Sequence, residues 1–282
     1  MWERFDSEDQ ILTGIREPVK RSNMVKGLYT ANWGMINEQK RVDILANNMA
    51  NAATTGYKKE GSTSEAFYDV LAYKIKDTSE PGIDKRLGAM NLGVKIGEVY
   101  TDYSQGAIHE TGNTFEMALS GKGFFAIEFT NKKGESSVKY TRDGHFQLNV
   151  QGELVNKNGD FVLDAGGNHI TLDPMADFTV DRQGVVWQNN QRMTQIQVTD
   201  FEDYNYLEKY GENYLTPLEG ATEVAPTAQV ISGYLEDSNV QVVQEMVDLI
   251  NFTRAYETNQ KMIQAIDSTI ETAVTKVGSV NG

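Results

Sequence analysis

Histidine, serine and aspartate are the side chains in this sequence that could support acid–base, nucleophilic or metal chemistry. The three histidines, His109, His145 and His169, lie 36 and 24 residues apart, and none belongs to a metal-ligand pattern such as H-E-x-x-H. Ser120 and Ser232 lack the G-x-S-x-G frame of a nucleophile elbow. A lone histidine in a strand or turn is usually structural or exposed. The sequence therefore predicts no catalytic site, no cofactor and no metal.

Aspartates recur through the middle of the chain and leave one enzyme class open, a carboxylate-pair hydrolase. Five of them fall among predicted turns: Asp160, Asp164, Asp173, Asp177 and Asp181. Carboxylates in turns are more often solvated surface than catalytic pairs. The segment NKNGD (156–160) begins like a calcium loop, but it lacks the glycine at the sixth position and the glutamate at the twelfth. We therefore expect a protein that is not an enzyme.

Charge and cysteine content narrow the classes of partner. The 282 residues carry 26 Lys+Arg against 40 Asp+Glu, a net charge of −14, so the chain repels phosphate backbones and we expect no nucleic-acid partner. The absence of cysteine excludes disulfides and thiolate sites. Residues 1–23 carry charges throughout and contain no secretory apolar stretch, so export would not use an ordinary cleaved signal.

Both ends of the chain have the apolar spacing of long amphipathic helices. Steps of three and four over residues 25–51 join Leu28, Ala31, Met35, Glu38, Val42, Leu45 and Met49. The same steps near the C-terminus join Phe252, Tyr256, Asn259, Ile263, Ile266, Ile270, Ala273 and Val277. A broader apolar face precedes them at Val242, Val243, Met246, Val247, Leu249 and Ile250. Ser238 or Asn239 is the expected N-cap of the second helix.

The middle of the chain changes to a period of two with turn residues between short runs, which predicts strands. The predicted strands fall at 93–103, 115–119, 123–129, 137–144, 145–150, 178–187 and 192–201. Residues 61–92 give no clear assignment. We therefore expect a mainly β middle domain flanked by long N- and C-terminal α-helices, α+β overall, with terminal helices that form coiled coils.

Asn47, Asn48 and Asn51 are spaced to share one helical face. Amides beside an apolar seam can fix the register between helices of neighbouring subunits. The alternative is an amide-rich helix end with Gly56 as terminator. The helices themselves could pair within one chain or with neighbouring copies, and the spacing alone does not choose.

Two motifs at opposite ends of the chain resemble flagellar rod and hook proteins. The N-terminal signature A-N-N-x-A-N-x-x-T-x-G-F-K is matched by Ala46, Asn47, Asn48, Ala50, Asn51, Thr54, Gly56 and Lys58, with Tyr57 in place of Phe. The C-terminal motif is matched by Leu235, Glu236, Ser238, Asn239, Val240, Glu245, Met246, Ile250, Arg254, Ala255, Tyr256, Glu257, Asn259 and Lys261. Between them, GKGFFAI (121–127) and YTRDGHFQLNVQGELV (140–155) are similar to the β domain of rod subunits, and YLEKYGENYL (206–215) occurs in both rod types.

The resemblance implies a structural subunit of the basal-body rod that polymerises through its terminal helices and transmits torque to the hook. It implies as partners other copies and other rod or hook subunits, together with the flagellar type III export apparatus, and no small-molecule substrate. The location would be the basal body, outside the cytoplasmic membrane. YTRDG, RAYE and LGVKIG are most similar to the distal rod type, with the proximal type next. A hook protein of the same family and a secreted β-rich adhesin or binding module remain alternatives.

The expected domain division is an extension at 1–23 that is disordered, an N-terminal helix and motif at 24–60, a linker at 61–92, a β domain at 93–234 and a C-terminal helix at 235–282. Because family members begin near the equivalent of Met24, we expect Met24 to be the native first residue. The expected N-terminal assembly residues are Leu28, Met35, Val42, Leu45, Asn47, Asn48, Met49, Asn51, Gly56 and Tyr57. Those of the C-terminal helix are Ser238, Asn239, Glu245, Met246, Ile250, Phe252, Arg254, Tyr256, Glu257, Ile263, Ile266 and Ile270. Glu257 could pair with Arg254 or Lys261, and Tyr57, Phe67 and Tyr68 could dock the β domain.

Overall fold

The computed structural model describes residues 23–67, 70–73, 86–90 and 93–278. The chain divides into two compact units. We call residues 1–43, 62–99 and 250–282 the helical unit, and residues 44–61 and 100–249 the β unit. The expected extension lies outside the described residues except for Asn23, and Tyr68 lies outside them too.

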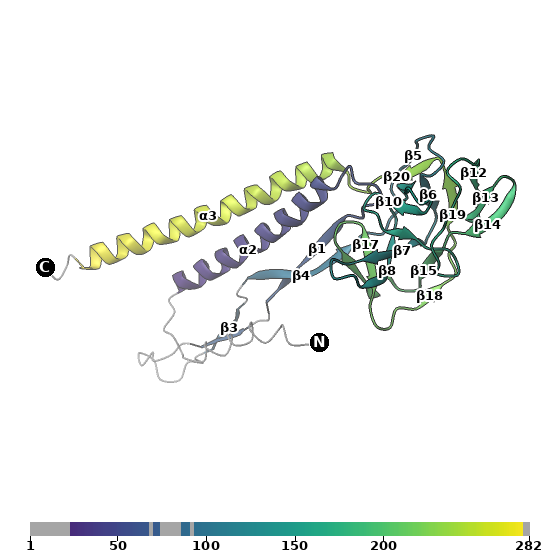
Figure 1. Cartoon of the computed structure of the whole chain (residues 1–282). Helices are drawn as coiled ribbons and strands as arrows, with labels where there is room; N and C mark the ends of the chain where they lie inside the picture. The colour runs from purple at the N-terminus through teal and green to yellow at the C-terminus, as the bar shows by residue number, and fades with distance from the viewer. Residues whose placement is uncertain (1–22, 68–69, 74–85, 91–92, 279–282) are drawn as a thin grey trace. The chain divides into compact units, whose positions relative to one another are not determined.

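As predicted, one long helix precedes the strands along the chain and another follows them: α2 (Asn23–Ala50) and α3 (Val242–Gly278) (Figure 1). The predicted cap of the second helix is wrong. Helix α3 begins three residues after Asn239, and its first turn closes with Glu245 N–H donating to the Gln241 carbonyl at 3.0 Å. Ser238 Oγ instead accepts from the Val240 N–H at 3.2 Å, because a short polar side chain readily closes a turn on its own backbone. No helix in the described ranges is long and apolar enough to cross a membrane.

Two pairs of strands accompany the helices in the helical unit. Strand β1 (Glu60–Ala66) pairs with β4 (Val94–Thr101), and β2 (Val70–Tyr73) pairs antiparallel with β3 (Arg86–Met90). Two contacts hold α2 to the start of this region: Asn37 Nδ2 donates to Ser64 Oγ at 3.3 Å, and the Trp33 and Phe67 rings meet edge to face with centroids 5.0 Å apart. The range predicted as a linker, 61–92, thus contains strands.

The β unit holds the remaining strands and one short turn of 3-10 helix, η1 (Tyr204–Tyr206). In chain order the strands are β5 (Ile108–Glu110), β6 (Met117–Ser120), β7 (Phe124–Thr130), β8 (Ser136–Thr141), β9 (Phe146–Leu148), β10 (Leu154–Asn156), β11 (Phe161–Val162), β12 (Phe178–Val180), β13 (Val185–Gln188), β14 (Gln191–Gln195), β15 (Val198–Phe201), β16 (Leu207–Tyr210), β17 (Tyr214–Pro217), β18 (Glu223–Val224), β19 (Gln229–Ser232) and β20 (Tyr234–Glu236). The main sheet has the order β16-β17-β8-β7-β11-β10-β9, and β15 pairs with β7 and β18. Smaller sheets join β12-β13-β14, β19-β6 and β20-β5.

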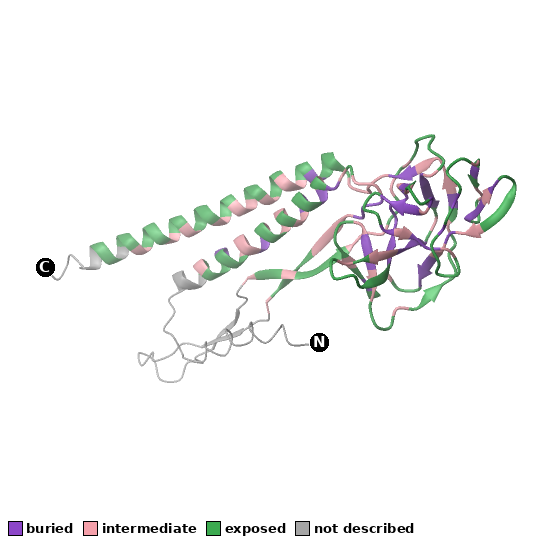
Figure 2. Ribbon diagram, in the orientation of Figure 1, coloured by how far each residue is buried: buried purple, intermediate pink, exposed green. Residues whose placement is uncertain are grey.

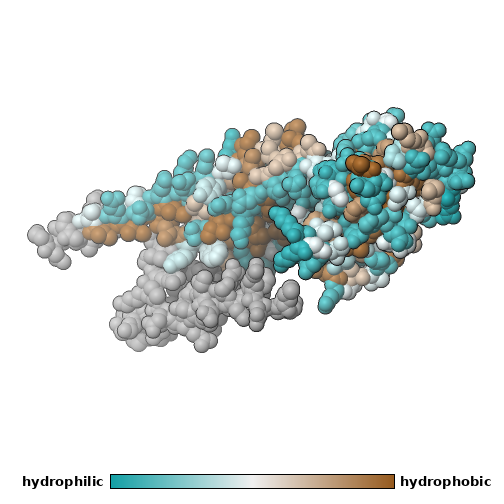
Figure 3. Space-filling model, in the orientation of Figure 1, coloured by the Kyte–Doolittle hydropathy of each residue, from teal (hydrophilic) through white to brown (hydrophobic). Residues whose placement is uncertain are grey.

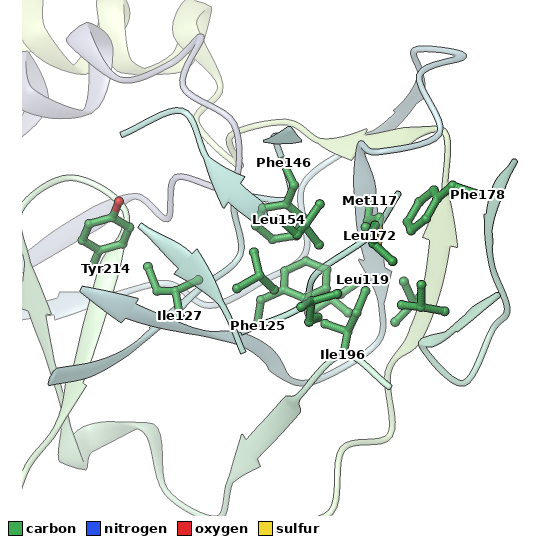
Figure 4. Close-up of a cluster of buried hydrophobic side chains, with 14 residues drawn as sticks. Met117, Leu119, Phe125, Ile127, Phe146, Leu154, Leu172, Phe178, Ile196 and Tyr214 are labelled. Carbon is green, nitrogen blue, oxygen red and sulfur yellow. The ribbon is translucent and has the colours of Figure 1, made fainter. Parts of the chain in front are cut away.

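Apolar side chains from most of these strands fill one core in the β unit (Figure 4). The buried members are Met117, Leu119, Phe125, Ile127, Phe146, Leu154, Val162, Ile170, Leu172, Phe178, Val186, Ile196, Tyr214 and Val230. Buried residues concentrate in the same strands in Figure 2. Alternation of buried and exposed positions is weak in β7, where Phe124 to Ile127 are all buried, because a second apolar cluster around Phe124, Tyr140 and Phe201 covers its other face.

Two ranges predicted as single strands are each a pair of strands. The range 178–187 is the β12–β13 hairpin, in which the Asp181 carboxylate accepts from the N–H groups of Gln183 and Val185 at 2.9 Å and closes the turn. The range 192–201 divides into β14 and β15, which belong to different sheets. The strands after residue 206 were not predicted.

Candidate functional site: a junction of the terminal motifs

Asn48 lies buried near the end of α2 and pairs with the backbone of Glu60 as a neighbouring strand would. Its Oδ1 accepts from the Glu60 N–H at 2.9 Å, and its Nδ2 donates to the Glu60 carbonyl at 2.8 Å. Oδ1 also accepts from the Tyr57 hydroxyl at 3.2 Å, and Nδ2 donates to Glu245 Oε2 at 3.3 Å. A single amide, which has both donors and acceptors, thus connects α2, the start of β1 and the first turn of α3.

The other two asparagines of the N-terminal motif have different surroundings. Asn47 is exposed, whereas Asn51 is buried just after the last residue of α2. Asn51 Nδ2 donates to the Asn47 carbonyl at 3.1 Å, and its Oδ1 accepts from the Thr54 hydroxyl at 3.2 Å. Asn48 and Asn51 therefore use their amides within the chain, and the features of a terminated helix are present.

Gly56 allows the turn after α2 to lie directly against the β8–β9 turn. Its φ of 66° is in the left-handed region, and its N–H donates to the Glu236 carbonyl at 2.8 Å. A Cβ at this position would lie 2.5 Å from the carbonyl carbon of Arg142. The neighbouring Thr55 hydroxyl donates to Asp143 Oδ1 at 2.6 Å. The TTGYK segment thus lies against the YTRDG segment.

A buried ion triad lies beneath this turn. Glu236 Oε1 is 2.6 Å from Lys58 Nζ, and Glu236 Oε2 is 3.2 Å from Arg142 Nη1, with the carboxylate fully buried. Lys58 Nζ also donates to the Ser104 carbonyl at 2.7 Å, and the Gly106 N–H donates to Glu236 Oε1 at 3.0 Å. Burial lowers the pKa of Lys58, an effect that the Glu236 carboxylate opposes. Each of the three motifs supplies one member of the triad.

Asn239 connects the C-terminal motif to the strands around residues 59 and 102. Its Oδ1 accepts from the Lys59 N–H at 2.8 Å, and its Nδ2 donates to the Asp102 carbonyl at 2.8 Å. The Asp102 N–H donates in turn to the Lys59 carbonyl at 2.9 Å. The asparagine therefore extends the backbone ladder by one pair of hydrogen bonds.

Two residues of the YLEKYGENYL segment belong to the junction, although the sequence did not mark them. Lys209 Nζ lies 4.0 Å from the centroid of the buried Tyr57 ring and donates to Glu60 Oε1 at 2.9 Å. Asn213 Nδ2 donates to the Thr55 carbonyl at 3.1 Å and to Asp143 Oδ2 at 3.2 Å. The resemblance of this segment to both rod types was the signal that could have found them. Burial raises the pKa of Tyr57 to about 12.

In the helical unit, contacts between α2 and α3 recur every seven residues along each helix. A Cβ on Gly27 would lie 3.4 Å from Ile266 Cδ1, and one on Gly34 would lie 2.9 Å from Asn259 Nδ2. The Arg41 guanidinium lies 3.8 Å from the centroid of the Phe252 ring. As the numbers rise along α2 they fall along α3, so the helices are antiparallel.

The stripe residues of both helices are partly covered. On α2, Leu45 is buried and Leu28, Met35, Val42 and Met49 are half-buried. On α3 the stripe residues Phe252, Tyr256, Asn259, Ile263, Ile266 and Ile270 are half-buried. These are the positions that the sequence placed on two facing stripes, here within one chain.

The opposite face of α3 has no cover within the described residues. We call it the outer stripe; its members, which fall on one side at about 100° per residue, are Val243, Met246, Val247, Ile250, Arg254, Glu257 and Lys261. The apolar members range from 47% to 78% exposed. Brown atoms gather along the helices in Figure 3, and exposed and half-buried positions alternate along α3 in Figure 2. The expected pairing of Glu257 with Arg254 or Lys261 is not formed; in the described ranges none of the three makes an ion pair.

Each candidate catalytic histidine lies beside a carboxylate, and His169 lies beside two, since its Nδ1 is also 3.8 Å from Glu153 Oε1. His109 is 3.0 Å from Asp237, His145 is 3.2 Å from Glu116, and His169 Nε2 is 2.7 Å from Glu128 Oε2. The hydrogen bond from His169 holds the pKa of Glu128 below its usual range. Among the described residues no three His, Asp or Glu side chains form a metal site.

Asp160 is an exception to the expectation that the aspartates are solvated. It is buried, and its carboxylate accepts a hydrogen bond from the hydroxyl of Tyr214 on β17 at 2.6 Å. Burial and this hydrogen bond raise the pKa of Tyr214. Asp164 and Asp181, in contrast, bond to backbone N–H groups of their own turns. The aspartates thus hold turns and strands in place.

A mainly β unit, two long helices that pair along their apolar stripes and a polar junction that joins the terminal motifs indicate a structural class of protein. Comparisons with known families agree. The sequence model described as flagellar basal body rod FlgEFG protein C-terminal matches residues 231–276. The flagellar hook protein FlgE/F/G D1 domain matches residues 118–188, and the flagella basal body rod protein family matches residues 28–58.

Whole-length relatives are similar across most of this chain. The flagellar basal-body rod protein FlgF of Caulobacter vibrioides is 35% identical over 260 residues, covering 92% of this chain and 100% of that protein. The flagellar hook-basal body complex protein FlhO of Bacillus subtilis is 31% identical, covering 91% and 100%. FlgG of Buchnera aphidicola is 29% identical, covering 88% and 98%.

The chain belongs to the flagellar basal-body rod protein family. It is a structural subunit and not an enzyme, and proteins of this family are part of the flagellar basal body.

Proposed function

We propose that this subunit polymerises with copies of itself and with other rod and hook subunits through α2 and α3, which form a coiled-coil layer. Support comes from the seven-residue spacing of the pairs Gly27–Ile266, Gly34–Asn259 and Arg41–Phe252, the period that places one side of a helix repeatedly on its partner. Gly34 permits a close approach of the two backbones. The intrachain pair would therefore be one repeat of the layer.

The outer stripe of α3 is the observation that carries the assembly proposal. Exposed apolar positions on one helical side favour association, and each Val, Ile or Met that becomes covered contributes about 1.5 to 3 kcal/mol. Arg254, Glu257 and Lys261 continue the same side with charges that have no ion-pair partner within the described part of the chain. The occupant we propose is a neighbouring rod subunit, whose matching charges would set the register.

The remaining roles follow from the family resemblance. We propose export through the flagellar type III apparatus without cleavage, addition at the growing end and transmission of torque to the hook. Similarity of YTRDG, RAYE and LGVKIG to the distal rod type supports a distal position. Gold labelling of a tagged subunit on isolated rods tests that position, since label confined to the motor-proximal part contradicts it.

The assembly proposal is tested in a strain that lacks the gene. The strain is complemented with the native chain, with Val247→Glu/Ile250→Glu on the outer stripe, or with Gln260→Glu, an exposed control position off that stripe. We expect truncated rods and loss of motility only for the double variant, with secretion of the subunit unchanged. Full-length rods carrying the double variant contradict a contact at the outer stripe.

The deletion strain also separates the alternatives. Truncated rods are expected for a rod subunit. Complete rods without hooks would indicate a hook protein, and motile cells with complete basal bodies would indicate a binding module.

A further inference from the structure

Two buried side-chain atoms of the junction lack a hydrogen-bond partner in the protein: Arg142 Nε and Asn213 Oδ1. Leaving such a group unmet in a buried place costs about 1 to 3 kcal/mol, so each one calls for an explanation. The described residues contain one other such atom, Glu38 Oε2, which lies 3.6 Å from Arg41 Nη1 and belongs to the helical unit. The two unpaired atoms of Arg142 and Asn213 therefore belong to one place, the junction in the β unit.

Neither side chain can satisfy these atoms by rotating. Arg142 already uses Nη1 for Glu236 at 3.2 Å and Nη2 for the Gly121 carbonyl at 2.7 Å. Asn213 uses Nδ2 for the Thr55 carbonyl and for Asp143 Oδ2. Reversing the Asn213 amide would set its oxygen against two acceptors, so its oxygen must point the other way.

Both side chains line one small cavity next to Gly56, with a volume of about 10 Å³. That is close to the smallest space that holds a water molecule, which needs two or more polar partners. Arg142 Nε offers a donor and Asn213 Oδ1 an acceptor. Thr101 and Glu212 add further polar groups to the lining.

We propose that a single ordered water occupies this cavity, accepting a hydrogen bond from Arg142 Nε and donating one to Asn213 Oδ1. A metal cation is disfavoured, because Lys58, Lys209 and Arg142 line the same space. An anion would face the Asn213 carbonyl oxygen and Glu212. Water is the species that meets one donor and one acceptor together.

This site gives the YLEKYGENYL segment a second task at the junction. Asn213 would hold Thr55 and Asp143 through its nitrogen and, through the water, Arg142 of the ion triad. The bridged groups come from the β8–β9 turn and the β16–β17 turn. The inference does not depend on the assembly proposal, because every residue belongs to the β unit.

The test is a crystal structure of the full chain at about 1.5 Å or better, from crystals grown in sodium chloride and in sodium bromide. We expect one density peak about 2.7 to 3.2 Å from both Arg142 Nε and Asn213 Oδ1, without anomalous signal from bromine. A cavity without density, or a peak that contacts only one of the two atoms, would overturn the proposal. A bromine signal would overturn it in favour of an anion site.

A pair of variants gives the matched comparison. Glu212→Gln changes another side chain of the lining and leaves Arg142 Nε and Asn213 Oδ1 in place, so the peak should remain. Asn213→Leu removes the acceptor and fills the space, so the peak should be lost. A peak that persists unchanged in Asn213→Leu would show that the amide oxygen does not hold it.

Discussion

Glu236 is the carboxylate that compensates both buried cations of the junction, which makes Glu236→Gln the most informative single substitution. The amide has nearly the same shape but no charge, so Lys58 and Arg142 would stay buried without a counter-ion. Removing one partner of a buried ion pair typically costs about 3 to 5 kcal/mol, because the remaining charge cannot regain its hydration. Since the side chain of Glu236 is fully buried and those of Lys58 and Arg142 are 6% and 5% exposed, the full range applies.

Urea unfolding of the full chain, followed by circular dichroism, measures this loss. At a slope of about 2 kcal/mol per molar urea, the midpoint should fall by about 1.5 to 2.5 M. The control is Glu65→Gln, which removes the partner of Lys95 from a pair whose side chains are 46% and 55% exposed. Exposed pairs contribute about 0 to 1 kcal/mol, so the control midpoint should hardly move. Equal small shifts for Glu236→Gln and Glu65→Gln would refute the reasoning.

A second background separates the charge effect from simple loss of packing. If the cost arises from an uncompensated Lys58, then Glu236→Gln should be clearly less costly in a Lys58→Met chain than in the native chain. The same cost in both backgrounds would assign the loss to Arg142 or to the Gly106 N–H instead.

Three other substitutions at the junction have expected outcomes of different kinds. Asn48→Asp sets a carboxylate 3.3 Å from Glu245. We expect the urea midpoint of this variant to lie about 1 M below that of the native chain at pH 7, a loss of about 2 kcal/mol. The difference between the two midpoints should narrow at pH 4, where carboxylates take up protons. Gly56→Ala should lower the free energy of unfolding by about 3 kcal/mol or more in the same assay, because its Cβ would meet the backbone of Arg142 and Asp143. The control Gly134→Ala, at φ 82° with open space around it, should lower it by about 1 to 2 kcal/mol. Equal losses would contradict the contact at Gly56. Burial raises the pKa of Tyr57 from 10.0 to about 12, so between these pH values the folded chain keeps a proton that the unfolded chain loses. The free energy of unfolding should therefore fall from pH 10 to 12, and it should fall less steeply in Tyr57→Phe. Parallel curves of unfolding free energy against pH would exclude a contribution from Tyr57.

The sequence predicts the helices well because their signal is periodic and long. The stripe from Leu28 to Met49 and the stripe from Phe252 to Ile270 both appear as partly covered sides of helices. Turn pairs such as Asp143–Gly144 also predict the break between β8 and β9 correctly. Hairpins with less obvious turns are harder: the β12–β13 turn depends on the Asp181 carboxylate, which composition alone does not distinguish from a surface aspartate.

The junction could not be predicted from spacing because its partners are far apart in the chain. Lys58 and Glu236 are separated by 178 residues, and Asn48 and Glu245 by 197. Periodicity assigns Asn48 to a helix side but does not reveal that Glu60 backbone will pair with it. Lys209 and Asn213 have no local pattern at all, since their partners at residues 55–60 are brought near only by the complete sheet.

The contacts divide the family motifs into two groups: residues that form hydrogen bonds or ion pairs within the chain, which we call committed, and residues that remain exposed. Asn48, Gly56 and Lys58 of the N-terminal motif are committed, as are Glu236 and Glu245 of the C-terminal motif. Five residues in the later part of the C-terminal motif lie on the outer stripe: Met246, Ile250, Arg254, Glu257 and Lys261. A substitution in the first group should therefore lower the stability of the isolated subunit, and through it rod formation. A substitution in the second group should leave that stability unchanged and act only when subunits assemble, so urea unfolding and rod length together tell the two groups apart.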